Sequence, residues 1–333
     1  QTDWSVDDSQ GYSGRSTTAW DVWGVTKDAF AAALRCFPPF PYVRESRRLV
    51  GLETLRNADI VRSDGRALRN WPEAMALGEY PVDIHGSHLD RFMEHDLGES
   101  AASFPRGWEP SRGVFQIPFG VFVPERIDGL LAAEKNISVS RLVNGAIRLQ
   151  PAVMLAGQAT GAIAALAVRN GCEVRDVDPI DVQLILLDAR SRLSMEAFAD
   201  VPEGTPEWEA VQIATLYGLL PGMTRDLYAP SLPMTARQAS ELLGRLSVAF
   251  PGRFCTPGRL AQPDPFPSAE VFRRALETIS IRDRSSGRGI LLPGGMAAED
   301  TLTRGAAVTM VLDALDAPGR SAADVRVGLE SVW

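Results

Sequence analysis

The chain has 333 residues, 45% of them hydrophobic and 23% charged, and its formal net charge is -8 at pH 7. A single hydrophobic core rarely serves a chain of this length, so two domains are expected. The negative charge argues against a nucleic-acid partner, because phosphate backbones attract basic surfaces. The 3 cysteines stand far apart, which excludes a disulfide framework and a CxxC motif.

The N-terminal segment shows no sustained hydrophobic period and is predicted to be irregular until a short helix at residues 26–34. A proline-rich turn then leads into an extended stretch that ends near residue 51. On a strand, the sequence RESRR would place Arg44 and Arg48 on one face. Two interpretations stay open for this pair: a salt-bridged surface, and a clamp that binds an anionic cofactor or substrate.

All three histidines, His85, His88 and His95, fall within the segment YPVDIHGSHLDRFMEHD. A metal site is one interpretation, but the HxxH spacing lacks the i, i+4 geometry by which a helix presents two zinc ligands, and no third motif supports it. The alternatives are ordinary surface or packing roles and, for His85, a position that faces a flavin or a substrate. The sequence therefore predicts no metal site.

Two short strands are predicted next. The first is the β-branched and aromatic stretch VFQIPFGVFV at residues 114–123, where Pro118 indicates an edge or a bend. The second is a buried strand at residues 127–133.

A helix is predicted from Pro151 to Asn170, because proline suits a first helical position and Gly171 suits the stop. Apolar residues cover every face of it, which predicts a buried helix. Gly157 and Gly161 belong to a stripe of small residues, and either tight helix packing or the close approach of a flat ligand would explain them. Polar and glycine residues interrupt its most apolar stretch, so no transmembrane segment is expected.

The C-terminal part differs in character, because helical patterns alternate there with Pro/Gly turns and predict a mostly helical second domain. A weak internal repeat runs through it. In each copy a threonine precedes the helix, as an N-cap would. The first copy is GLLPG at 218–222 with PMTARQASELLGRL at 233–246, and the second is ILLPGG at 290–295 with TLTRGAAVTMVLDAL at 301–315.

An ordered series of motifs over residues 40–170 resembles the FAD-dependent oxidoreductase family, within the glutathione-reductase-like group of flavoproteins. Each motif is weak alone, and the series in order and with sensible spacing is fairly specific. The motifs are YVRESRRLVG at 42–51, YPVDIHG at 80–86, IPFGVFVP at 117–124, IDGLLAAEKNIS at 127–138 and IRLQPAVMLAGQATGAIAAL at 147–166.

This resemblance implies an α/β fold, the C-terminal part of a split Rossmann-type FAD/NAD(P)-binding fold with a substrate domain, over residues 1–190. It implies FAD as cofactor and residues 130–133 as the closing strand. The family's GxGxxG turn, which binds the pyrophosphate, occurs nowhere in this sequence. We therefore expect an N-terminal segment or subunit that carries GxGxxG to complete the site, which would make the enzyme a heteromer if that segment is a separate chain.

The resemblance also implies site residues. The family usually has Ala-Gly-Arg or Ala-Gly-Lys beside the flavin, whereas this chain has Glu134 in place of the glycine. The N-terminus of the helix at Pro151 would face the flavin with its positive dipole. His85 resembles the family's histidine in the DIH motif and is the candidate catalytic residue, with Arg44 and Arg48 as candidate substrate ligands. The expected cofactor-binding residues are Ala133, Glu134, Lys135, Arg148, Gln150, Pro151, Ala152 and Gly157.

The repeat region resembles degenerate S-layer-homology modules of bacterial proteins, well over residues 198–246 and less well over 274–315. It predicts a small all-α repeat domain at residues 195–333. The favoured function is flavin-mediated oxidation or dehydrogenation of a small organic substrate. Two alternatives stay open: a non-catalytic module that binds cell wall or protein and keeps a relic flavin fold, and a metal-dependent hydrolase built on the histidine cluster.

Overall fold

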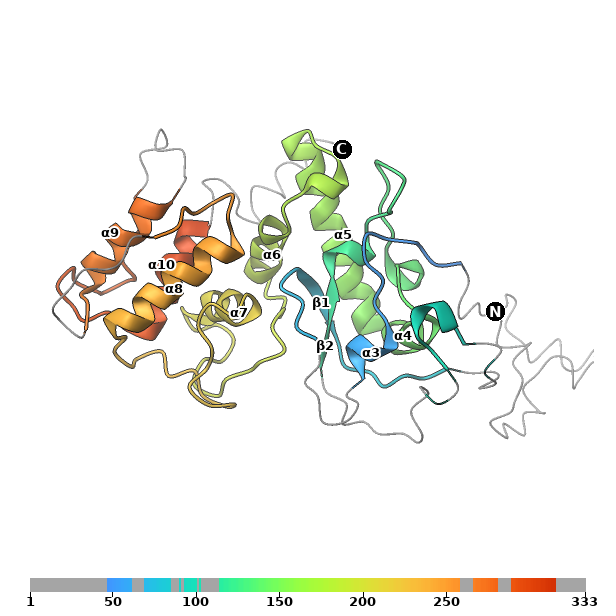
Figure 1. The fold of residues 1–333 in the computed structure, drawn as a ribbon, viewed down its shortest axis with the longest axis horizontal. Coiled ribbons are helices and arrows are strands. Elements are labelled where there is room, and N and C mark those ends of the chain that lie inside the picture. The colour runs from blue at the N-terminus through green and yellow to red at the C-terminus, as the bar shows by residue number, and fades with distance from the viewer. Residues whose placement is uncertain are drawn as a thin grey trace, which may run out of the picture. The chain divides into compact units, whose positions relative to one another are not determined.

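The computed structural model describes residues 47–61, 69–84, 90, 93–100, 102, 114–257, 266–280 and 289–315 (Figure 1). The chain divides into two compact units, one of Gln1–Arg69 and Met75–Val177 and the other of Asn70–Ala74 and Asp178–Trp333. The predicted domain ranges of 1–190 and 195–333 stay a prediction. The helix expected at residues 26–34 lies outside the described residues.

The first unit combines a small sheet with helices. Its strands β1 and β2 pair with each other, and an extended segment at residues 49–55 bonds to chain on both sides. In that segment, the N–H of Leu52 donates to the Val123 carbonyl and the N–H of Leu55 to the Ser138 carbonyl. The elements of this unit are α3 (Asn57–Ile60), β1 (Ala74–Gly78, whose first residue is grouped with the second unit), η4 (His95–Leu97), β2 (Phe115–Pro118), η7 (Phe119–Val121), η8 (Glu134–Asn136), α4 (Arg141–Ile147), α5 (Gln150–Asn170) and η9 (Val174–Asp176).

The two strands predicted at 114–123 and 127–133 have different outcomes. The first half of the earlier stretch is strand β2, and the chain bends after Pro118 into a 3-10 turn, as the proline indicated. The prediction of a strand at residues 127–133, with 130–133 as the closing strand, is wrong for the described chain, whose only sheet pairs β1 with β2. Ala132 donates one backbone hydrogen bond to Phe122, and a strand needs a whole ladder of such bonds.

Helix α5 has the predicted ends. Proline lies in its first turn, and Gly171 stops it with a left-handed φ of 63°. The prediction that it is buried all round is wrong, because only one face, which carries Ala159, Ile163 and Leu166, is covered, while Met154 is 73% exposed. By length and composition α5 could cross a membrane, a criterion that the core helix of a globular protein also meets.

The second unit is mostly helical, as predicted (Figure 1). Helix α10 packs against α7 and α9, and α8 packs against α9, so the repeat region has a core of its own. Fully buried side chains of Tyr228, Phe254 and Phe272 fill this core. The helices are α6 (Pro179–Asp188), α7 (Trp208–Leu216), α8 (Ala236–Ala249), α9 (Ala269–Ile279) and α10 (Arg304–Leu315).

The threonine caps predicted for the repeat are present. Thr235 Oγ1 accepts the N–H of Gln238 at the start of α8, and Thr303 Oγ1 accepts the N–H of Ala306 at the start of α10. The segments that precede the two helices also pair, because the Met234 N–H donates to the Leu302 carbonyl at 2.8 Å. The two sequence copies are therefore neighbours in space.

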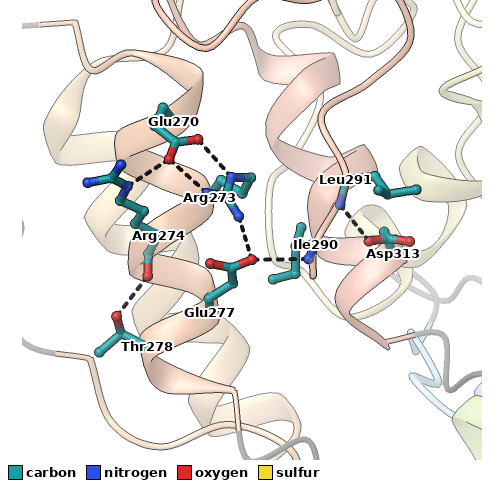
Figure 2. A network of polar contacts seen from close by, with 8 residues as sticks. All are labelled: Glu270, Arg273, Arg274, Glu277, Thr278, Ile290, Leu291 and Asp313. Carbon is teal, nitrogen blue, oxygen red and sulfur yellow. Dashed lines mark hydrogen bonds and ion pairs between the residues drawn. The ribbon is translucent and has the colours of Figure 1, made fainter. Parts of the chain in front are cut away.

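A polar network holds the ILLPGG segment of the second repeat copy, residues 290–295, in place (Figure 2). The carboxylate of Glu277 on α9 accepts hydrogen bonds from Arg273 and, at 3.1 Å, from the N–H of Ile290. Asp313 on α10 accepts the N–H of Leu291 at 3.0 Å. One short segment is thus fixed to two helices through its backbone.

Candidate functional site

The N-terminus of α5 is open. Its N-cap residue, Leu149, makes no side-chain cap, and no acidic residue lies in the first turn. Gln150 and Pro151 are exposed, while Ala152 is buried. The first N–H groups of a helix lack partners within the helix and carry partial positive charge, so this end of a long helix suits an electron-rich group.

Arg148 joins this helix start to the segment that precedes His85. Its Nη2 donates to Asp83 Oδ2 at 2.8 Å and to the Asp83 carbonyl at 3.4 Å. The Arg148 side chain is only 8% exposed. Arg148 is therefore a cation already held by a carboxylate, and it braces the helix start against the DIH segment.

Two further contacts fix the same segment on α4. Gly145 approaches it so closely that an added Cβ would lie 2.7 Å from the Asp83 carbonyl oxygen. Ile84 packs into a buried cluster with Leu142. His85 follows directly in the chain and lies outside the described residues, as does Arg44.

Glu134 has a backbone conformation that is typical of glycine. Its φ of 62° lies in the left-handed region, which glycine adopts at little cost and other residues adopt with strain. The preceding Ala133 is extended, and the turn η8 that contains Glu134 and half-buried Lys135 packs against α5. The conformation at this position therefore suits a glycine better than the glutamate that the chain has.

Arg48 forms an ion pair with Glu94, whose second oxygen accepts the N–H of Arg141 at 2.7 Å. Glu99, which is almost fully buried, accepts the N–H of Leu142 at 3.1 Å. Two carboxylates therefore cap α4, and Arg48 balances one of them. Sequence reasoning missed both glutamates, because nothing in EHDLGES shows that it meets a helix start more than forty residues later. The substrate role of Arg48 stays a prediction.

Three polar atoms between residues 140 and 148 are buried without a hydrogen-bond partner in the described part of the chain. They are Ser140 Oγ, Asn144 Oδ1 and Arg148 Nε. Buried polar atoms in folded proteins are nearly always paired. This region therefore has spare capacity for the polar atoms of a bound group.

The histidine cluster gives no metal centre within the described residues, where no group of three or more His, Cys, Asp or Glu side chains is placed to hold an ion. His95 is exposed, and its Nε2 lies 3.3 Å from an Asp90 oxygen. His85 and His88 lie outside this part of the chain.

Comparison with family models decides the family. The model of the FAD dependent oxidoreductase family matches residues 15–186, which is more than half of the chain. The chain belongs to this family. Its cofactor is accordingly FAD, and its fold is Rossmann-like. No curated protein and no solved structure matches the chain.

The described residues fit the cofactor of an FAD-dependent oxidoreductase. The uncapped start of α5 and the unpaired Nε of Arg148 offer hydrogen-bond donors to an electron-rich ring system. Gly157 lies on the exposed face of α5 with open space where a Cβ would stand. The matched range contains all the predicted site residues and ends before the repeat region.

Proposed function

We propose that this chain forms the flavin-covering, C-terminal part of an oxidoreductase that oxidises or dehydrogenates a small organic substrate. The open N-terminus of α5, braced by Arg148 and Asp83, is the observation that carries the proposal. Bound FAD supplies an acceptor for two electrons, and the helix dipole stabilises the negative charge that reduction adds.

Each site residue has a role in this proposal. The first-turn N–H groups of α5 hold the electron-rich edge of the flavin, and Arg148 is a positioning residue that aligns the helix start with the DIH segment. His85 is the proposed acid or base toward the substrate. The backbone at Ala133, Glu134 and Lys135 passes beside the ring. Arg44 and Arg48 are the proposed substrate ligands.

A GxGxxG-bearing segment or subunit completes the FAD site in our proposal. Two observations support it: the sequence lacks that turn, and apolar side chains are uncovered. Leu130 is 45% exposed and Val168 is 78% exposed. Val168 shares one face of α5 with the exposed Met154. A docked segment would cover this face.

Two preparations test the proposal: the chain expressed alone, and native material captured through a tag on the chain. We expect visible flavin absorbance and a GxGxxG sequence, by mass spectrometry, in the native sample alone. Stoichiometric flavin on the lone chain would overturn the partner part of the proposal, and a native sample without flavin would overturn the oxidoreductase.

Surface variants sharpen the partner test. Val168→Glu places a charge on the uncovered face, and we expect it to abolish co-purification of the GxGxxG sequence. Arg169→Glu, at the exposed neighbouring position, is the matched control and should leave co-purification intact. Equal loss in both variants, or in neither, would contradict a docking surface on this face of α5.

The second candidate is a binding module without catalysis, in which S-layer-like repeats attach to a cell-wall glycan. The pairing of the two repeat copies through Met234 and Leu302 favours it, as does the glutamate at position 134. Co-sedimentation with purified cell walls tests it. Sedimentation combined with a flavin-free native sample would select this candidate over the enzyme.

A further inference from the structure

A pocket of about 590 Å³ lies within the second unit, between residues 72–73 and one face of α8. It is separate from the flavin site, and neither the family nor the repeat resemblance assigns it a role. Its lining combines an aromatic residue, aliphatic residues and three charged side chains. The lining residues are Pro72, Glu73, Tyr217, Gly218, Glu241, Gly244, Arg245, Val248 and Ala249.

Hydrogen bonds from one buried side chain fix one wall of the pocket, formed by residues 72–74 and Tyr217. Gln183, which is fully buried, donates from Nε2 to the carbonyls of Pro72 at 2.7 Å and Ala74 at 3.0 Å. Its Oε1 accepts the hydroxyl proton of Tyr217 at 2.8 Å. These bonds hold residues 72–74 and the Tyr217 ring in one arrangement before any ligand arrives, and pre-organisation of this kind lowers the cost of binding.

The three charged side chains of the pocket differ in whether they already have a hydrogen-bond or ion-pair partner in the chain. Glu241 is paired with Arg237 at 2.9 Å, and Arg245 Nη1 donates to the Gly218 and Leu219 carbonyls. The Glu73 carboxylate has no hydrogen bond or ion pair to any residue that the structure describes. Glu73 is exposed at the surface, and partial desolvation, with a smaller contribution from Asp178, raises its pKa, so the described residues provide this carboxylate with no paired cation.

We propose that this pocket binds an amine, a ligand that carries a protonated amino group on an apolar body. The ammonium group pairs with the Glu73 carboxylate, which gains the counter-ion that the chain does not supply. The body of the ligand lies against Pro72, Tyr217 and Val248, the last of which is 81% exposed. An aromatic ring beside a carboxylate is a common setting for organic cations.

Calorimetry on the full chain with three probes of matched shape tests the proposal: 2-phenylethylamine, 2-phenylethanol and phenylacetate. We expect the amine to bind at least about tenfold more tightly than the alcohol, with the carboxylate weakest, since a charge-assisted hydrogen bond distinguishes them. Equal binding of the three probes, or no binding of the amine, would overturn the proposal.

Two variants locate the binding. Glu73→Gln should weaken the amine about tenfold or more and leave the alcohol unchanged, while Glu241→Gln, a second carboxylate on the same wall, should change the amine less than about threefold. Amine affinity that survives Glu73→Gln would overturn the assignment. If thermal unfolding shows that Glu73→Gln is not folded, the probe series on the unmodified chain decides the matter.

Discussion

Helices α5 and α8 begin in opposite ways. Thr235 caps α8 in a reciprocal arrangement, in which its hydroxyl accepts the N–H of Gln238 and the Gln238 side chain accepts the N–H of Thr235. The N-cap residue of α5 is Leu149, whose side chain has no oxygen that could accept a first-turn N–H. Helices α8 and α10 of the second unit are thus capped by threonines that directly precede them, whereas α5, the longest described helix of the first unit, has no side-chain cap.

The largest expected effect tests the brace beside the open helix. Arg148→Ala should lower the free energy of unfolding by about 2–3 kcal/mol, because it removes a buried guanidinium that is bonded to the half-buried Asp83 carboxylate. It should also reduce flavin retention in the native complex. Urea unfolding and the flavin-to-protein ratio measure the two effects.

Arg237→Ala on α8 is the matched control for that brace. Arg237 also pairs with a carboxylate, but its side chain is 88% exposed, so the loss should stay within about 0.5 kcal/mol and flavin should be retained. Similar losses of stability and flavin in the two arginine variants would contradict a special role for the Arg148–Asp83 pair.

The next effect tests the threonine caps of α8 and α10. Thr235→Ala and Thr303→Ala should each cost about 1 kcal/mol, because each removes an oxygen that accepts a first-turn N–H. Neither variant should change flavin content. Thr309→Ala, on the same helix as Thr303 but past its first turn, is the control in urea unfolding and should cost less. A loss of flavin in either cap variant would contradict the separation of the two units.

These helix starts also show what sequence could predict. The ends of α5 follow from Pro151 and Gly171, and the caps of α8 and α10 follow from threonine before an apolar pattern, because such signals act within one turn of the chain. The burial of α5 could not be predicted, since an apolar face says nothing about whether a partner covers it.

The candidate site also has features that the sequence could predict and features that it could not. The motif series located Glu134, Arg148 and the DIH segment in the sequence, but it could not show that Arg148 is bound to Asp83. That pairing joins residues 65 positions apart and depends on the close approach of α4, which Gly145 permits. Long-range pairings of this kind follow from the packed fold rather than from local pattern.

A smaller effect concerns the turn that packs on α5. Glu134→Gly should raise the free energy of unfolding by about 0.5–1 kcal/mol, because the left-handed φ of 62° strains glutamate and suits glycine. Ala133→Gly is the control, and it should lower stability by a similar amount, since Ala133 is extended and gains nothing from glycine. Changes of the same sign in both variants would show that the conformation at position 134 is not the cause.

The smallest effect tests whether the Glu73 carboxylate in the second unit lacks a paired cation, just as the first-turn N–H groups of α5 in the first unit lack a side-chain cap. The pKa of Glu73 is raised above 4.5, so the folded chain holds this proton more tightly than the unfolded chain does. The contribution of Glu73 to stability should therefore fall as pH rises from 4.5 through the raised pKa. Subtracting the unfolding free energy of Glu73→Gln from that of the unmodified chain, across this range, isolates the effect, and Glu241→Gln should not reproduce it. A difference that rises with pH would mean that a cation of the chain already compensates Glu73, and the chain itself would then supply the partner of this carboxylate, as it supplies the caps of α8 and α10.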